Sequence, residues 1–332
     1  LYARSARAAW YDGDPQQGRA LCQEGLAAVV GAPESPGIAI LIHEAARSLY
    51  FTGAPLDQAR ELGQQAFEMA ERLQVVSVQA DALATLGLLP DQEPWKAVET
   101  LHLAVELAES AGLLAQARRA HNNLAAQLQE RASDFHAALK HYQRAAELSR
   151  QTGSVEGEII ALSNMASAAW WTGDLSRAEQ TFEQRRQLFS EAANPALAAA
   201  GLRISEALLL RCRGELGQAA ELLQECQLEA RRQESSQHLL QCVLSWADLQ
   251  IEIGMSADGQ KAVEWGQVQA ILQEAVETSD LIWAGERVWA RCLLAAVRAC
   301  QGRFKEAHYV LAEAREVAGP SSIPLDEMWL SW

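Results

Sequence analysis

Apolar and polar residues alternate along this chain with the period of an amphipathic α-helix, in blocks that short polar turns separate. Segment 175–192 is typical, with apolar residues at positions 175, 178, 182, 188 and 189. Apolar side chains spaced three, four or seven residues apart line one face of a helix. No segment keeps the strict alternation of a half-buried strand. The pattern therefore predicts an all-α protein.

One short turn pattern recurs along the chain. A glycine and, five residues later, a small residue occur at Gly173–Ala178, Gly214–Ala219 and Gly302–Ala307. Along the whole chain the small residue falls at positions 18, 59, 97, 138, 178, 219 and 307. The steps of 41, 38, 41, 40 and 41 residues, followed by 88 residues for two units, indicate an internal repeat.

Each repeat is predicted to be a hairpin of two helices. The turn glycine suits the left-handed position that ends the first helix, and an Asp after it can cap the second helix. Gly112 and Gly153 are expected to end second helices in the same way. Such hairpins bury their apolar faces only by stacking on their neighbours. The expected fold is an all-α, right-handed superhelical solenoid of about eight helix-turn-helix repeats.

The repeats divide the chain without a clear domain boundary. We expect a single array over residues 1–332. Its units lie near 1–35, 36–75, 76–113, 114–153, 154–194, 195–235, 236–280 and 281–319. Residues 320–332 are predicted to begin a further helix, so we expect the chain to be a piece of a longer protein.

The hairpin resembles the tetratricopeptide repeat (TPR). That family places a Leu and small residues in the first helix and an Ala-x3-Phe in the second. The fifth unit has this arrangement in Leu162, Ala169, Gly173, Ala178 and Phe182. The period here is longer than the roughly 34 residues of the family. The resemblance implies a non-catalytic module that binds a protein, a peptide or another ligand on its concave surface.

A narrower resemblance concerns the first helices of two units. Asn-Asn-Leu-Ala at 122–125 and Ser-Asn-Met-Ala at 163–166 are similar to the sensor arrays of bacterial STAND and LuxR-type signal-transduction ATPases. This implies a ligand-sensing or partner-sensing array of a larger bacterial signalling or transcription regulator in the cytoplasm. The phosphate-binding loop of such an ATPase and a basic DNA-recognition helix are both missing from the sequence.

Aromatic and basic residues precede several of the predicted turns. In the family, the first helix of each hairpin lines the concave surface, and this register places eight candidate residues there. They are Arg4, Arg7, Trp10, His43, Arg47, Tyr50, Ser167 and Trp170. Arg beside Trp and Tyr suits a small anionic ligand or a peptide carboxylate. The aromatic residues would equally pack between hairpins and the arginines pair with acidic neighbours, so both interpretations remain open.

Composition restricts the partners. The net charge of −15 repels phosphate backbones, which argues against nucleic-acid binding. No apolar run is long enough for a membrane span. The six cysteines form no C-x-x-C pair, so we expect reduced core thiols. The apolar residues Trp329, Leu330 and Trp332 predict self-association through that end of the array.

Catalytic patterns are missing from the sequence. It contains no nucleophile elbow and no H-E-x-x-H, and His136 and His141 fall on different faces of a helix. We therefore expect no enzyme activity, no cofactor and no metal site. Two alternatives to the sensing array remain open: a free-standing scaffold that clamps a peptide of a partner protein and, more remotely, a helical hydrolase.

Overall fold

The computed structural model describes residues 1–11, 14–52, 56–89, 94–132, 134–189, 195–232, 236–256, 263–282 and 284–318. This part of the chain holds sixteen helices and no strand. They are α1 (Tyr2–Tyr11), α2 (Pro15–Ala28), α3 (Pro36–Phe51), α4 (Leu56–Arg72), α5 (Val76–Leu86), α6 (Pro94–Ser110), α7 (Leu114–Ala132), α8 (Phe135–Thr152), α9 (Val155–Trp171), α10 (Leu175–Phe189), α11 (Pro195–Cys212), α12 (Leu216–Arg232), α13 (Ser236–Met255), α14 (Trp265–Ile282), α15 (Ala284–Cys300) and α16 (Phe304–Ala318). The prediction of an all-α fold built from helix hairpins is confirmed.

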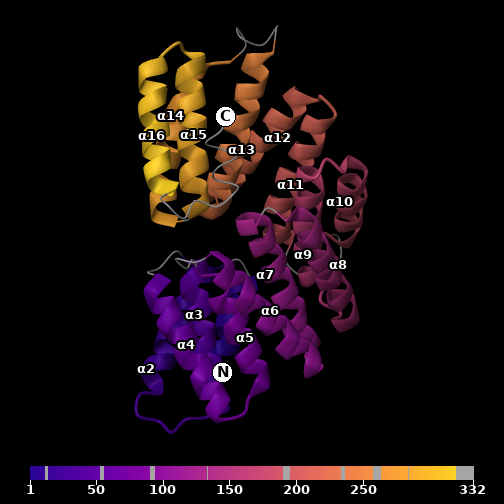
Figure 1. Cartoon of the computed structure of the whole chain (residues 1–332), viewed down its shortest axis with the longest axis vertical. Helices are drawn as coiled ribbons and strands as arrows, with labels where there is room; N and C mark the ends of the chain where they lie inside the picture. The colour runs from indigo at the N-terminus through magenta and orange to yellow at the C-terminus, as the bar shows by residue number, and fades with distance from the viewer. Residues whose placement is uncertain are drawn as a thin grey trace. The chain divides into compact units, whose positions relative to one another are not determined.

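The chain forms two compact units; in Figure 1 the colour of unit 1 runs from indigo through magenta to rose, and that of unit 2 from rose through orange to yellow. Unit 1 is Leu1–Ala198 and holds α1 to α10, whereas unit 2 is Ala199–Trp332 and holds most of α11 and α12 to α16. The predicted repeat boundaries and the single array over 1–332 stay predictions. The predicted helix at 320–332 lies outside the described residues.

The turns between helices have the predicted chemistry. Gly112, Gly153, Gly173, Gly214 and Gly302 all have a φ between 66° and 78°, the left-handed region that glycine adopts without a Cβ clash. Aspartates cap the helices that follow some turns: the carboxylates of residues 14, 134 and 174 accept from backbone N–H groups three residues on, at 2.8, 2.9 and 3.1 Å. Gly13, Gly53 and Ser133, which precede the small residues at positions 18, 59 and 138 by five or six residues, lie outside the described part.

In unit 1 the odd-numbered helices form one layer. Each of α1, α3, α5 and α7 contacts the next odd-numbered helix, and each of α2, α4, α6 and α8 packs against the odd-numbered helices before and after it. Small residues make these contacts close; Ala80, Ala108, Ala117 and Leu148 form one buried cluster between α5, α6, α7 and α8. The polar side chains of the odd-numbered helices therefore lie opposite their counterparts one repeat away.

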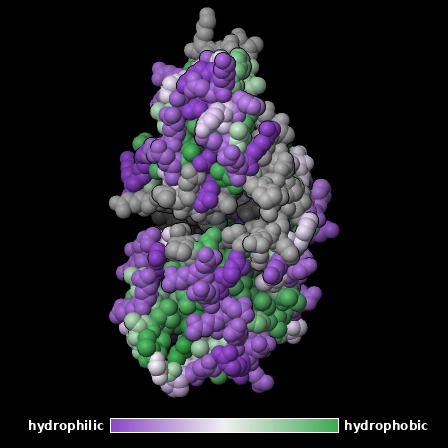
Figure 2. Space-filling view, turned by 60° about the vertical axis from the view of Figure 1, so that its left-hand side comes forward, coloured by the Kyte–Doolittle hydropathy of each residue, from purple (hydrophilic) through white to green (hydrophobic). Residues whose placement is uncertain are grey.

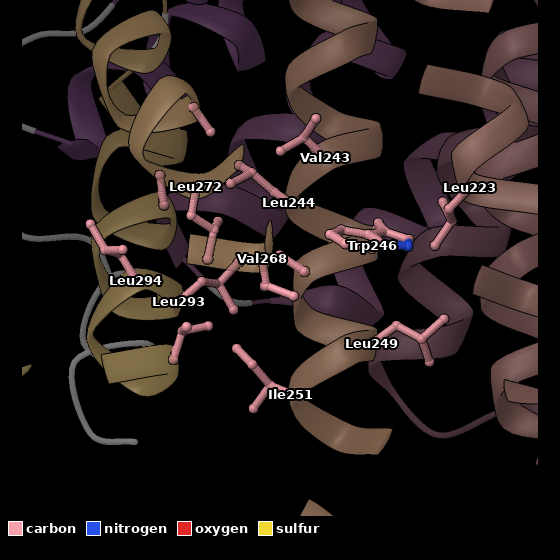
Figure 3. Packing of buried hydrophobic residues seen from close by; sticks show 14 of the residues in the cluster. Leu223, Val243, Leu244, Trp246, Leu249, Ile251, Val268, Leu272, Leu293 and Leu294 are labelled. Atoms are coloured by element: carbon pink, nitrogen blue, oxygen red, sulfur yellow. The ribbon is translucent and has the colours of Figure 1, made fainter. Parts of the chain in front are cut away.

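Unit 2 has a larger apolar core. A continuous cluster joins α11 to α16 and includes Leu223, Leu244, Trp246, Leu272 and Leu293. Figure 3 shows these side chains between α13 and its neighbours, with Trp246 directed towards Leu223. Leu244 and Leu272 are fully buried. Unit 2 is therefore held together by large aliphatic and aromatic side chains.

The surface is mainly hydrophilic. Figure 2 shows hydrophilic residues over much of the visible face, with hydrophobic areas between them in its lower part, which belongs to unit 1. Exposed apolar side chains occur in both units; among the described residues, Val30, Trp95, Met255, Phe304 and Tyr309 are the most exposed large ones after Leu1. In the described part, no helix combines the length and the apolarity that a membrane span requires.

Candidate functional site

Polar side chains join each odd-numbered helix of unit 1 to the next one. Three of these pairs are Arg7–Glu44, His43–Thr85 and Asn122–Asn164, with partners 37, 42 and 42 residues apart. A fourth, an ion pair, joins Asp81 of α5 to Arg119 of α7. The spacing equals one repeat, so equivalent surfaces of successive hairpins carry complementary polar groups. We call this layer of odd-numbered helices the inner layer. The candidate residues of the sequence analysis belong to its helices.

At the N-terminal end, the inner layer is built around a buried carboxylate. Glu44 is fully buried, and its oxygens accept from Arg7 Nη2 and Arg47 Nη2, each at 2.6 Å. Burial alone would raise the pKa of Glu44, but the two guanidinium groups outweigh it and lower the pKa to about 2. The Arg47 guanidinium also lies 4.8 Å from the Trp10 ring centroid and 5.6 Å from that of Phe51.

Several residues of the expected anion-binding site are buried in or beside this cluster. His43, Arg47 and Tyr50 are only 1, 7 and 8 % exposed, because α3 is surrounded by α1, α2, α4 and α5. His43 Nε2 lies 3.0 Å from Thr85 Oγ1, and burial holds the pKa of His43 well below its usual range. Arg4 is exposed, and the Arg7 side chain is 39 % exposed. That these five residues contact a ligand stays a prediction; the three buried ones would have to move first.

The sequence reasoning missed Glu44, the residue that organises this cluster. Arg47 follows it by three positions, which puts both side chains on one face of α3. The sequence did contain a signal for this ion pair, because Glu44 stands one helical turn before the candidate residue Arg47. The structure therefore supports pairing with an acidic neighbour as the role of Arg47, one of the two interpretations that the sequence left open.

Further along unit 1, side chains of the inner layer are only half-buried. Apart from the charged Arg119, which pairs with Asp81, five polar residues of α7 and α9 that face this layer are half-buried and uncharged. We call them the α7–α9 stripe: Asn122, Asn123, Ser163, Asn164 and Ser167. Asn164 Nδ2 donates to Asn122 Oδ1 at 3.1 Å, and Asn123 Nδ2 donates to the Ala84 carbonyl at 2.9 Å. The amide oxygen of Asn123 and the hydroxyl of Ser167 give the stripe further hydrogen-bonding capacity.

The two tryptophans at the end of α9 have different neighbours. Trp170 and Trp171 are both half-buried and touch edge to face, with ring centroids 4.7 Å apart. Trp171 also stacks on Phe135 of α8, 6.2 Å away. Trp171 thus packs on the neighbouring hairpin, whereas Trp170 follows Ser167 by three residues and adds an aromatic surface to the end of the stripe.

Unit 2 also has charged side chains that join two successive odd-numbered helices, α11 and α13. Arg211 of α11 donates to Asp248 and Glu252 of α13, both at 2.5 Å. Burial raises the pKa of Asp248, and Arg211 opposes this shift. Arg211 and Asp248 are 37 residues apart, about one repeat, and the structure brings them into contact. Both side chains are mostly buried, so this pair joins helices.

Histidines, cysteines and acidic residues are the side chains best suited to metal binding or acid–base chemistry. Among the residues that the structure describes, no cluster of three or more His, Cys, Asp and Glu side chains could hold a metal ion. The six cysteines are free thiols, four of them buried. A histidine pair, His121 and His141, joins α7 to α8. It was missed because the sequence reasoning compared His141 only with His136 of the same helix.

The family comparison agrees with the repeat. Residues 116–191, which span α7 to α10, match the family model described as "Tetratricopeptide repeat". A comparison with curated proteins finds no match. The likeness to STAND and LuxR-type sensor arrays therefore stays a prediction.

Solved structures of similar fold cover most of the chain. The apo form of the quorum sensor NprR from B. thuringiensis is 15 % identical, with a TM-score of 0.57 over 96 % of this chain and 86 % of that chain. Aspartyl phosphate phosphatase F from Bacillus subtilis is 11 % identical, with a TM-score of 0.57 over 90 % and 75 %. The human IFIT1 dimer with m7Gppp-AAAA is 14 % identical, with a TM-score of 0.54 over 97 % and 68 %. Identities this low show the fold alone, so the chain carries a tetratricopeptide-type match at 116–191 within an all-α helical-repeat fold.

Proposed function

We propose that this chain is a tetratricopeptide-type protein-interaction module, and that its α7–α9 stripe binds an extended peptide or a segment of a partner protein. The observation that carries the proposal is the row of half-buried, uncharged amide and hydroxyl groups on α7 and α9. An extended peptide leaves its backbone N–H and C=O groups unpaired, and amides can donate to and accept from both. Trp170 offers an aromatic surface for one side chain of the peptide.

We further propose that the module is the sensing array of a larger bacterial signalling or transcription regulator in the cytoplasm, without enzyme activity of its own. The likeness of 122–125 and 163–166 to sensor arrays supports it. A fold shared with a quorum sensor also agrees with it. A free-standing scaffold remains the second candidate. The neighbouring coding sequence separates the two, because a regulator requires an ATPase or a DNA-binding domain in the same polypeptide.

A small anionic effector is the alternative ligand, and the exposed guanidinium groups of Arg4 and Arg7 favour it. In that case binding would depend on the N-terminal cluster and be insensitive to changes in the α7–α9 stripe. Binding to the N-terminal cluster should also weaken as salt screens the arginines, whereas hydrogen bonding by neutral amides should depend little on salt.

Peptide selection tests the proposal directly. Random peptides displayed on phage are selected against the full chain, and a labelled selected peptide is titrated by fluorescence anisotropy. Ser167→Arg should weaken binding roughly tenfold or more, a loss of about 1.4 kcal/mol, because it fills the inner surface of α9. Ser176→Arg is the matched control, since Ser176 is exposed at the start of α10.

The control should bind within about twofold of the wild type, a difference of about 0.4 kcal/mol. Equal binding by both variants would contradict the assignment of the α7–α9 stripe. Failure to select any peptide would contradict peptide binding itself and favour the small effector.

A further inference from the structure

Three helices of unit 1 meet at a row of ionisable side chains outside the α7–α9 stripe. His121 of α7 lies between Glu109 of α6 and His141 of α8. Its Nδ1 is 2.8 Å from the Nδ1 of His141, and its Nε2 is 3.2 Å from Glu109 Oε1. His121 is buried at 6 % exposure, and His141 is half-buried.

The hydrogen bonds fix where the protons lie. The Glu109 carboxylate can only accept, so neutral His121 carries its proton on Nε2 and its Nδ1 is an acceptor. His141 must then donate from Nδ1 and leave its Nε2 unprotonated. The ring centroids are 5.1 Å apart, the end-to-end arrangement expected of two imidazoles that share one hydrogen bond.

We propose that His121 and His141 form an acid-sensitive latch that fastens α8 to α7 while both imidazoles are neutral and releases it when both are protonated. A first proton can occupy His141 Nε2 without breaking the Nδ1–Nδ1 contact. A second proton must go to His121 Nδ1, and two N–H donors then face each other across a distance that only one proton can bridge. Release therefore follows the second protonation step of the coupled pair.

Charged groups around the pair tune the latch. From α6, Glu109 favours protonation and His102 opposes it once charged; from α8, Arg144 and Lys140 oppose it. The neighbouring helices α5 and α9 have their buried acids engaged elsewhere, Asp81 with Arg119 and Glu158 with Arg150. Burial lowers the pKa of His121, and burial together with His121 and His102 lowers the pKa of His141 to about 4.

The lowered pKa values of the two histidines define the pH range in which the latch opens. Because the folded pKa of His141 lies below the ordinary value of 6.5, the unfolded chain binds more protons between pH 6.5 and about 4. The stability that the latch contributes is therefore complete above that window and is lost as the pH falls through it. His141 is partly exposed, so solvent screening reduces the effect below what the pKa shift alone would give.

One substitution separates the latch from general acid effects. In His141→Asn the amide reaches the same place as Nδ1 and can turn over, donating to neutral His121 and accepting from protonated His121. The melting temperature of the full chain is measured at pH 7.5 and pH 5 for the wild type, His141→Asn and the control His136→Asn, an exposed site on the same helix. The wild type and the control should lose at least about 3 °C more than His141→Asn between the two pH values. Equal losses in all three proteins would overturn the proposal.

A second measurement requires no variant. Histidine 15N NMR of the wild-type chain reports the protonation of each ring, and hydrogen exchange reports opening of α8. Both rings should be neutral at pH 7 and take up their protons below the ordinary histidine range, His141 first, and exchange in α8 should rise as His121 becomes protonated. If either ring titrates at its ordinary pKa while α8 stays protected, the latch does not exist.

Discussion

Unit 1 and unit 2 are built from the same hairpin but are held together differently. In unit 1, small residues such as Ala80, Ala108 and Ala117 bring helices close, and polar pairs spaced one repeat apart join the odd-numbered helices. In unit 2, a continuous apolar core that contains Leu244, Trp246 and Leu272 joins α11 to α16. The two units therefore share the arrangement of their helices and differ in the side chains at the contacts between helices.

The difference has a functional consequence. Close packing through alanines leaves the polar side chains of α7 and α9 half-exposed on the inner layer, where they can bond to a partner. A core of large apolar side chains gives more buried area and more stability per contact. The half-buried polar layer that we propose for binding lies in unit 1, and the continuous apolar core described above lies in unit 2.

The largest effect is expected from a cavity in unit 2. Leu272→Ala removes a fully buried side chain from the core and should cost about 3–5 kcal/mol. The loss should appear in hydrogen exchange of α13 to α15 and leave α7 to α9 unchanged. Leu228→Ala, at an exposed position of α12, is the control and should have little effect. A uniform loss of protection over both units would mean that they do not have separate cores.

In unit 1 the largest effect should come from the buried carboxylate. Glu44→Gln leaves Arg7 and Arg47 without their shared anion and should cost about 2–4 kcal/mol, less than a wholly buried pair because Arg7 is partly exposed. Urea unfolding measures the change. The control Glu34→Gln breaks an exposed pair with Arg72 and should leave the urea midpoint nearly unchanged, because solvent screens this pair. Equal costs for the two variants would show that burial of Glu44 does not matter.

Overpacking tests the small residues of unit 1. Ala117→Leu inserts a large side chain where Ala80, Ala108 and Leu148 are in contact, and should cost about 1–3 kcal/mol. Ala312→Leu, at an exposed position of α16, is the matched control. Thermal unfolding of both variants decides the question. A tolerated leucine at 117 would show that the helices of unit 1 do not depend on close contact.

The smallest effect should be the same in both units, because the turn is common to them. Gly173→Ala and Gly302→Ala place a Cβ at a φ of 73° and 76°, with no atom within 4 Å of either Cβ. Each should therefore cost only the backbone strain, about 1 kcal/mol. Unequal losses of melting temperature, after allowing for the size of each unit, would show that the two turns are not equivalent.

The period of the sequence was sufficient to predict the fold. Three features of the hairpin are local in sequence: the turn glycine, the capping aspartate and the small residue at the start of the second helix. Each acts on residues within a few positions, so a local sequence pattern is enough to predict it. Gly173 and Asp174 illustrate this, since both have the predicted conformation and hydrogen bond.

The candidate site was harder to predict, because it depends on contacts between residues about one repeat apart. The register placed His43 and Tyr50 on the first helix of a hairpin, but their burial follows from how α1, α2, α4 and α5 enclose α3. The pairing of His121 with His141 likewise requires the positions of α7 and α8. A one-dimensional pattern gives the face of a helix, and the neighbouring helices decide whether that face is open.

The most direct test of the account is hydrogen exchange of the full chain with and without a selected peptide. Binding along the α7–α9 stripe should slow exchange in α7 and α9 and leave the unit 2 helices α14 to α16 unchanged. Protection confined to unit 2, or to α1 and α3 around Glu44, would contradict the claim that the half-exposed polar layer of unit 1 is the binding surface.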